Sequence, residues 1–334
     1  MRVFVTGATG FIGTAVVKEL IGAGHHVIGL TRSAQGAKRL SAAGVEPLSG
    51  TLHDLQSLRR GAGAADAVIH LAFIHGFTDA PLSARLRVIA RGLIGRSVVS
   101  GFMSAVLATD RIAIETLAQT LGRSDRPLVL TVGTMGLRPG RLAIETDPAD
   151  PNSPGGARSV PTERAAAEFS SRGVRATVVR LPPSVHGDGR AGLVSRLIEI
   201  ARRKGRSVRI GDGANRWGAV HRLDVARLYL KVLEQGAAGD TYHGVAEEGV
   251  HLRDIARLIG RRLDVPVVSQ TEAEAARSLS WLAPFVSADN PVSSQQTQQQ
   301  LDWHPRGPSL LYDIDQADHY GMDPATPRPV GSDA

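Results

Sequence analysis

Short runs of apolar and β-branched residues alternate with amphipathic segments of helical length through the first half of the chain. The runs predict strands at Val3–Ala8, His26–Thr31, Val45–Gly50, Ala67–Ala72, Pro127–Val132 and Ala176–Leu181. Helical patterns such as GTAVVKELIGAG and RIAIETLAQTLG lie between them. Strands that alternate with helices at this spacing form parallel sheets with right-handed crossovers. The pattern therefore predicts an α/β fold built on a doubly wound parallel sheet, with ligands beyond the carboxyl ends of its strands.

This alternation loosens after Pro182, which indicates a change of domain. The segments DVARLYLKVLEQG and LRDIARLIGRRL still predict helices, and DTYHGVA predicts one more strand. We expect a Rossmann-type domain over residues 1–182 and a smaller C-terminal substrate-binding lobe over residues 183–310, with the chain returning to the main sheet at about 215–247. Residues 311–334 end in Pro, Gly and small polar residues and are expected to form a C-terminal extension or tail.

A long segment at about residues 78–107 interrupts the crossover between the fourth and fifth predicted strands. It is rich in helix-forming residues and apolar on one side. One interpretation is an extra pair of helices that covers the sheet or makes a subunit contact, as in a homodimer. The other is a lid over the active site.

Three glycines follow the first predicted strand in VFVTGATGFIG and open the first helix. Gly7 allows a tight turn, Gly10 allows the backbone to approach a pyrophosphate, and Gly13 allows close packing of helix and strand. The start of the helix offers N–H donors and a positive dipole end to the phosphates. The sequence therefore predicts a dinucleotide site that includes Gly7, Thr9, Gly10, Phe11, Ile12 and Gly13.

The end of the second strand bears on the choice of cofactor. An acidic residue there would bind the ribose 2′-hydroxyl of NAD, but GLTRS contains none. Arg32 offers a planar cation suited to a 2′-phosphate, and Thr31 and Ser33 add hydroxyl donors. We therefore expect NADP(H) to be preferred over NAD(H).

The remaining cofactor contacts are expected at the ends of later strands. Thr51 and Leu52 lie where the adenine would be bordered, and Leu71 and Ala72 follow the fourth strand beside the pyrophosphate and nicotinamide ribose. Pro182 lies where the chain passes the nicotinamide. His70 fits a core position as well as a site position.

Charge and composition exclude several other functions. The net charge of +7 is not concentrated beside aromatic residues, which make up 4% of the chain, so no nucleic-acid partner is expected. No apolar run reaches the roughly 18 residues that span a membrane. The chain has no cysteine, which excludes disulfides and thiolate chemistry. We expect a cytoplasmic protein with a small-molecule substrate and no bound metal.

The motifs TGATGFIG, VIHLAF, VVRLPPSVHGDG, AVHRLDVARL and LDWHP occur in an order that resembles the extended short-chain dehydrogenase/reductase family, in its epimerase/dehydratase-like branch. The resemblance covers residues 1–306 apart from the long segment. It implies a Rossmann domain, a small substrate domain and bound NAD(P)(H). It also implies a Ser/Thr–Tyr–Lys set, in which Tyr transfers the proton, Lys lowers the Tyr pKa and holds the nicotinamide ribose, and Ser/Thr orients the substrate.

That catalytic set is only partly present. The hydroxyl position falls on Thr131 or Thr134, of which we prefer Thr134. The Tyr and Lys positions align with Val160 and Arg164, and Asp110 replaces a helix asparagine of the family. No tyrosine of the chain is followed four residues later by Lys; the tyrosines are Tyr229, Tyr242, Tyr312 and Tyr320. The chain thus resembles an atypical subgroup that keeps the cofactor loop and lacks the Tyr-x-x-x-Lys motif.

Other residues would then have to replace the missing tyrosine. Arg164 is expected to contact the ribose or stabilise an oxyanion, although an arginine cannot act as an acid near neutral pH. His186 is a candidate proton donor because histidine titrates in a suitable range; His221 or a water held by Thr134 are alternatives. An imine or an activated alkene would need less help with the proton than a ketone.

These residues favour an NADP(H)-dependent oxidoreductase acting on a small or medium carbonyl, imine or enone metabolite. Two alternatives stay open. One is a non-catalytic NAD(P)-binding sensor or regulatory protein, which the missing tyrosine favours. The other is an epimerase or lyase that retains its cofactor.

Overall fold

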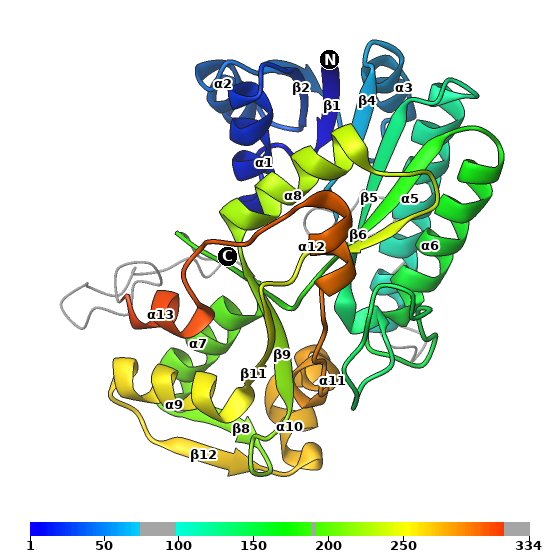
Figure 1. Ribbon diagram of the computed structural model, residues 1–334. Coiled ribbons are helices and arrows are strands. Elements are labelled where there is room, and N and C mark those ends of the chain that lie inside the picture. Colours follow the sequence, from blue (N-terminus) through cyan, green and yellow to red (C-terminus); the bar gives the residue numbers. More distant parts are fainter. Residues whose placement is uncertain (74–97, 189–191, 317–334) are drawn as a thin grey trace.

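The computed structural model describes residues 1–73, 98–188 and 192–316, and its centre is a seven-stranded sheet in the order β10-β6-β5-β4-β1-β2-β3 (Figure 1). All neighbouring strands are parallel. The strands are β1 (Arg2–Thr6), β2 (His26–Thr31), β3 (Glu46–Ser49), β4 (Ala67–His70), β5 (Pro127–Gly133), β6 (Arg175–Leu181) and β10 (Thr241–His243). The predicted doubly wound fold is confirmed, and the strand order reverses between β1 and β4.

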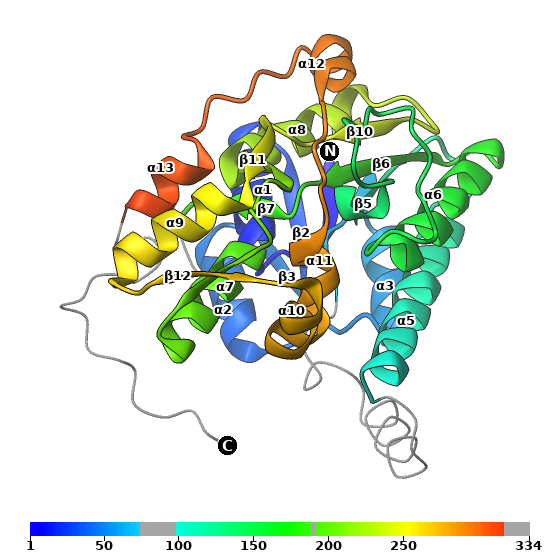
Figure 2. The same cartoon turned by 90° about the horizontal axis from the view of Figure 1, so that it is seen from below.

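Helices cover both faces of this sheet. On one face lie α1 (Phe11–Gly22) and α8 (Arg222–Gln235), whose side chains share a core with β1, β4, β5 and β6. On the other face α3 (Leu55–Gly63), α5 (Val98–Leu121) and α6 (Gly156–Ser171) lie side by side (Figures 1 and 2). The short helix α2 (Ala34–Ala42) follows β2. Burying apolar side chains on both faces explains why the strands are nearly continuous apolar runs.

A second lobe follows β6 and lies below the main sheet in Figure 1. Its strands are β7 (Ser184–His186), β9 (Arg216–His221) and β11 (Glu247–His251) in one sheet, and β8 (Ser207–Ile210) and β12 (Val267–Gln270) in another. Its helices are α7 (Gly192–Lys204), α9 (Leu252–Leu263), α10 (Glu272–Leu279), α11 (Ala283–Ser287) and α13 (Leu310–Asp315). These elements share a separate apolar core. One further helix, α12 (Gln295–Leu301), contacts α8 and β10 of the main sheet.

Two predicted segments, at residues 78–107 and from residue 311 onward, have different outcomes. Residues 78–97 of the long segment are not among those described, so the insert, the lid and the homodimer contact stay predictions. Residues from Val98 to Leu107 belong to α5 itself. The expected extension from residue 311 is corrected, because α13 buries Asp313 and Ile314 against the lobe and makes this stretch part of the fold.

The edge strand β10 is fixed by a buried histidine. His243 is fully buried, its Nδ1 donates to the carbonyl of Ser293 at 2.7 Å, and its Nε2 accepts from Arg180 at 3.2 Å. Arg180 also pairs with Glu163 of α6 at 2.7 Å. Burial, and secondarily the charge of Arg180, lowers the pKa of His243 from 6.5 to about 3.

We therefore expect the protein to lose stability as the pH falls below 6.5. The unfolded chain takes up a proton on this histidine in that range, whereas the folded chain does so only near pH 3. For one proton the slope is about 1.4 kcal/mol per pH unit. Urea unfolding between pH 7 and 4.5 should show a flatter pH dependence for His243→Asn than for the unmodified protein. His26→Asn, at an exposed position of β2, should leave the slope unchanged.

Candidate functional site at the carboxyl ends of β1, β4 and β5

The turn after β1 is closed so tightly that side chains cannot enter it. Gly7 has φ of +75°, a conformation that L side chains rarely adopt. A Cβ on Gly13 would lie 2.0 Å from the carbonyl oxygen of Gly7, and one on Gly7 would lie 2.9 Å from the nitrogen of Ala72. Both glycines are therefore required for the backbone to pass this closely.

The start of α1 is open to an anion. Its N-cap, Gly10, supplies no side-chain cap, and the first turn contains no acidic residue. The first backbone N–H groups of the helix have no intrahelical partner, and the helix dipole places partial positive charge on them. In contrast, α2 and α3 are capped by Ser33 and Asp54. The residues present thus fit a dinucleotide pyrophosphate, and Thr9, Phe11 and Ile12 lie in this exposed or half-buried turn.

At the end of β2 the predicted phosphate contacts are not equivalent. Arg32 and Ser33 are exposed, and the hydroxyl oxygen of Ser33 accepts from the N–H of Gly36 at 3.0 Å. Thr31 is 5% exposed and its Oγ1 would lie 2.1 Å from a Cβ on Gly36, so it packs under α2. The expectation that Thr31 donates to a 2′-phosphate is therefore corrected, because its hydroxyl faces the protein.

The other predicted contacts surround the same edge of the sheet. Thr51 is half-buried and Leu52 is buried after β3, while Leu71 and Ala72 are half-buried after β4. Pro182 is buried after β6. Their roles toward the cofactor stay predictions.

A chain of hydrogen bonds runs through the interior beneath this edge. Ala72 N–H donates to Thr6 Oγ1 at 3.3 Å, Thr6 Oγ1 and His70 Nδ1 are 2.8 Å apart, and His70 Nε2 and Asp110 Oδ1 are 3.2 Å apart. Arg158 Nε then donates to Asp110 Oδ2 at 2.9 Å. One assignment satisfies every group: the Thr6 hydroxyl donates to Nδ1, and Nε2–H donates to the carboxylate. His70 is thus a buried connecting residue.

Asp110 and Arg158 form the end of this chain, between α5 and α6. Burial disfavours the charge of Asp110, but Arg158 and His70 favour it, and the net effect lowers the pKa of Asp110 to about 2. The Arg158 guanidinium also lies over the ring of Phe73, 4.0 Å from its centroid. The cation is therefore held on one side by a carboxylate and on another by an aromatic face.

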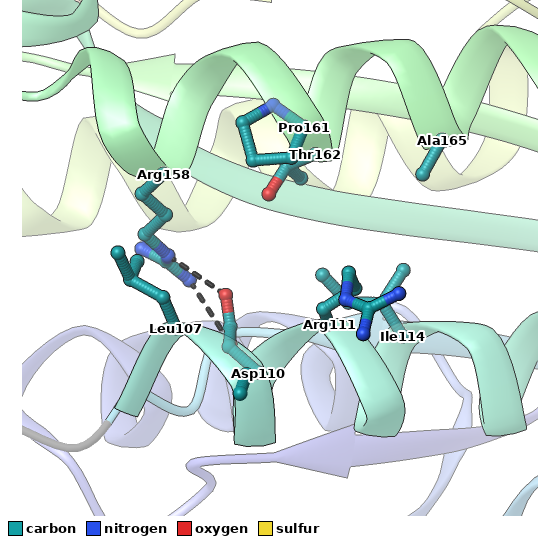
Figure 3. A pocket seen from close by; sticks show the side chains of 9 residues that line it. Leu107, Asp110, Arg111, Ile114, Arg158, Pro161, Thr162 and Ala165 are labelled. Atoms are coloured by element: carbon teal, nitrogen blue, oxygen red, sulfur yellow. Dashed lines mark hydrogen bonds and ion pairs between the residues drawn. The ribbon is translucent and has the colours of Figure 1, made fainter. Parts of the chain in front are cut away.

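A cavity of about 210 Å³ opens beside this pair (Figure 3). Its polar lining residues are Asp110, Arg158, Arg111 and Thr162. The other walls are apolar and consist of Leu107, Ala108, Ile114, Pro161 and Ala165. Its volume is below the roughly 300–1,000 Å³ of small-molecule sites, so it is too small to hold a whole dinucleotide.

The structure gives Thr134 a structural role. Its side chain is fully buried, its Oγ1 donates to Asn290 Oδ1 at 2.7 Å, and Asn290 Nδ2 donates back to the Thr134 carbonyl at 3.0 Å. The expected contact of Thr134 with a substrate oxygen is thus corrected. The neighbouring Thr131 lies 2.6 Å from the hydroxyl of Tyr229. Tyr229 is completely buried, which raises its pKa, so it cannot replace the missing acid.

Arg164 lies on the solvent side of α6. Its side chain is 82% exposed and pairs with Glu168 one turn later, at 3.5 Å. The predicted ribose or oxyanion contact of Arg164 stays a prediction, and no described residue of the site bonds to this side chain. The residues that face inward are Gly156, Ser159, Thr162, Ala166 and Phe169, with Arg158 beside them.

His186 joins the lobe core to α13. Its Nδ1 is 2.6 Å from Asp313 Oδ2, and both side chains are 1% exposed. Its Nε2 has no hydrogen-bond partner among the described residues and lies 3.9 Å from Glu247. Since a proton donor must reach its substrate, the predicted catalytic role of His186 is corrected to a structural one. His221 lies beside it, with ring centroids 5.6 Å apart, and burial lowers the pKa of His221.

Sequence reasoning missed Arg158, Asn290 and Arg222. Arg158 is next to the inward-facing residues of α6, which recur every three or four positions. This helical periodicity was the only local pattern that pointed to Arg158. Arg222, at the start of α8, places its guanidinium 5.0 Å from the ring centroid of Phe11, at the start of α1. No local pattern indicated Asn290, because its partner Thr134 follows β5, 156 residues earlier in the chain.

Residues 1–73, 98–188 and 192–316 hold no cluster of His, Cys, Asp or Glu suited to a metal ion. In the same residues no helix is long and apolar enough to cross a membrane.

Comparisons with known proteins agree with this geometry. The model of the NAD dependent epimerase/dehydratase family matches residues 3–245. The uncharacterized protein C2A9.02 of Schizosaccharomyces pombe is 42% identical, over 94% of this chain and 98% of its own. A 4-hydroxy-2-methyl-3-oxo-4-farnesyl-3,4-dihydroquinoline-1-oxide ketoreductase of Stigmatella aurantiaca is 27% identical, over 87% of this chain and 84% of its own.

Among solved structures, the dTDP-glucose 4,6-dehydratase DesIV of Streptomyces venezuelae, with NAD bound, superposes with a TM-score of 0.71. It is 20% identical and covers 96% of both chains. At this identity the likeness establishes the fold.

Substituting Gly13 by Ala should damage the cofactor site. The new Cβ would meet the Gly7 carbonyl, so the turn must shift; we expect a loss of about 1–3 kcal/mol in stability and at least tenfold weaker NADPH binding, measured by fluorescence titration. Gly22→Ala, in the same helix, is the matched control, because a Cβ there has no neighbour within 4 Å. It should leave binding unchanged. NADPH binding by Gly13→Ala at the unmodified level would contradict the assignment of this turn.

Proposed function

The chain belongs to the NAD dependent epimerase/dehydratase family, and from that premise we propose that it is an NADP(H)-dependent oxidoreductase. Its substrate is a small or medium metabolite with a carbonyl, imine or enone group. The family and the relatives support an NAD(P)-dependent enzyme of the oxidoreductase, epimerase or dehydratase type. The single observation that carries the proposal is the closed glycine turn at the uncapped start of α1.

The residues that would hold the cofactor are the turn from Gly7 to Gly13 at the pyrophosphate and Arg32 at the adenosine end. When bound, NADPH supplies a hydride to the electrophilic carbon of the substrate. The preference for NADP(H) is supported by Arg32, which is exposed at the end of β2 in a segment without an acidic residue.

The proton of the reduction is proposed to come from solvent. Thr134 and His186 are buried and Tyr229 has its hydroxyl bonded to Thr131, so none of them can serve. Imines and enones fit such a site best, because a protonated imine needs no further acid at the moment of reduction. The ketoreductase among the relatives supports carbonyl substrates as well. Because the chain has no cysteine, we also propose that it works in the reducing cytoplasm.

One observation favours a second candidate. The burial of Thr134 and His186 leaves the predicted catalytic residues without access to a substrate, which suits a protein that binds NAD(P) as a sensor. An epimerase or lyase with retained cofactor is a third type that the family includes.

Turnover distinguishes these candidates. We expect NADPH to be oxidised in the presence of at least one member of a panel of ketones, cyclic imines and enones, followed by absorbance at a fixed enzyme concentration. Tight NADPH binding with no turnover across the panel would instead support the sensor.

Replacing Arg32 by Asp should reverse the cofactor preference. The cation that meets the 2′-phosphate is lost and a carboxylate suited to the ribose 2′-hydroxyl is gained, so the ratio of NADPH to NADH affinity should fall by at least tenfold. Arg257→Asp on α9 makes the same charge change at an exposed site in the other lobe and is the control. An unchanged ratio in Arg32→Asp would remove the argument for NADP(H).

A further inference from the structure

Arg158 lies near the carboxyl ends of the strands, close to the point at which the strand order reverses. A dinucleotide in this fold crosses the carboxyl ends of the strands at that reversal, between β1 and β4. Arg32, at the end of β2, marks the adenosine side, so the nicotinamide side lies over β4 and β5. Arg158 is linked to the end of β4 through Asp110 and His70, and it lies over Phe73, just beyond that strand.

The ion pair with Asp110 uses only part of the Arg158 guanidinium. Nε and Nη2 face Asp110 at 2.9 and 3.5 Å, whereas Nη1 has no hydrogen-bond partner among the described residues. The side chain is 19% exposed, so solvent or a ligand can reach it. Asp110 stays ionised at any ordinary pH, because its pKa is lowered to about 2. The ion pair therefore holds the cation in place without using all of its N–H groups.

We infer that Arg158 is a cofactor-binding residue of this chain, with Nη1 donating to the hydroxyl groups of the nicotinamide ribose. Arg158 and Thr162 are four residues apart and both line the cavity beside α6. Val160 and Arg164, which align with the Tyr and Lys positions of the family, have the same spacing. The inference rests on the proposed function, because it assumes that NADP(H) or NAD(H) binds. Its alternative is that Arg158 merely neutralises the buried Asp110.

A double substitution separates these two roles. Arg158→Met alone leaves Asp110 with an uncompensated buried charge, so it should lower the midpoint of thermal unfolding. Adding Asp110→Asn removes that charge and should restore the midpoint. If Arg158 binds the ribose, the double variant should still bind NADPH at least tenfold more weakly than the unmodified protein, by fluorescence titration.

A cofactor fragment tests which half of the site is affected. The ligand 2′,5′-ADP carries the adenosine half with its phosphate groups and lacks the nicotinamide ribose. Its affinity, measured by calorimetry, should be the same in the double variant and the unmodified protein. Arg164→Met, on the solvent side of the same helix, should change neither affinity.

The results that would overturn the inference are specific. NADPH binding by the double variant at the unmodified level would show that Arg158 only neutralises Asp110. Equal weakening of NADPH and 2′,5′-ADP would show a general loss of the site. If this double variant fails to fold, Arg158→Leu with Asp110→Asn decides: it removes both charges and every side-chain donor at residue 158, so NADPH should bind more weakly and 2′,5′-ADP should bind as in the unmodified protein. Failure of the unmodified protein to bind either NADPH or NADH overturns the proposed function, and is seen without any variant.

Discussion

A buried carboxylate determines how the sheet edge and the two neighbouring helices meet. Asp110 is 3% exposed, and a charge at that depth is tolerated only when donors surround it. Its donors come from β4, through His70, and from α6, through Arg158. His70 is in turn fixed by Thr6 of β1. The rotation of α6 about its own axis follows from this pairing, which brings Arg158 inward and leaves Arg164 in solvent.

The second lobe is attached to the same edge by polar contacts, and these contacts occupy predicted substrate-binding residues. Asn290 exchanges two hydrogen bonds with Thr134, at the end of β5. Asp224, fully buried in α8, accepts the backbone N–H groups of Arg306 and Gly307 at 2.7 and 2.8 Å. These contacts replace solvent on groups that would be costly to bury unpaired. The attachment of the lobe therefore explains why the hydroxyl after β5 is not free.

Under the proposed function, the molecule has the backbone turn that would bind the cofactor, whereas the predicted proton-transfer residues are buried. The glycine turn and the uncapped start of α1 depend on backbone shape, whereas acid catalysis depends on a side chain at one position. A tyrosine near β5 is present, but Tyr229 lies in the core of the sheet and burial raises its pKa. Substrates that need no strong acid are consistent with both facts, and so is a role in sensing the cofactor.

The sequence alone predicted the first six strands of the main sheet and the glycine turn. Apolar runs located these six strands to within one or two residues, because strands buried on both faces are apolar along their length. The strands of the second lobe were not predicted. The tight glycine turn forms as predicted, because a Cβ on Gly13 would meet the Gly7 carbonyl and one on Gly7 would meet the backbone of Ala72; its contact with a cofactor stays a prediction. The tertiary structure decided what each polar side chain does. Thr134 and Asn290 are 156 residues apart and His186 and Asp313 are 127 apart, so their pairing depends on packing that no local pattern records. The choice between Arg158 and Arg164 likewise depends on which side of α6 faces a buried carboxylate on another helix.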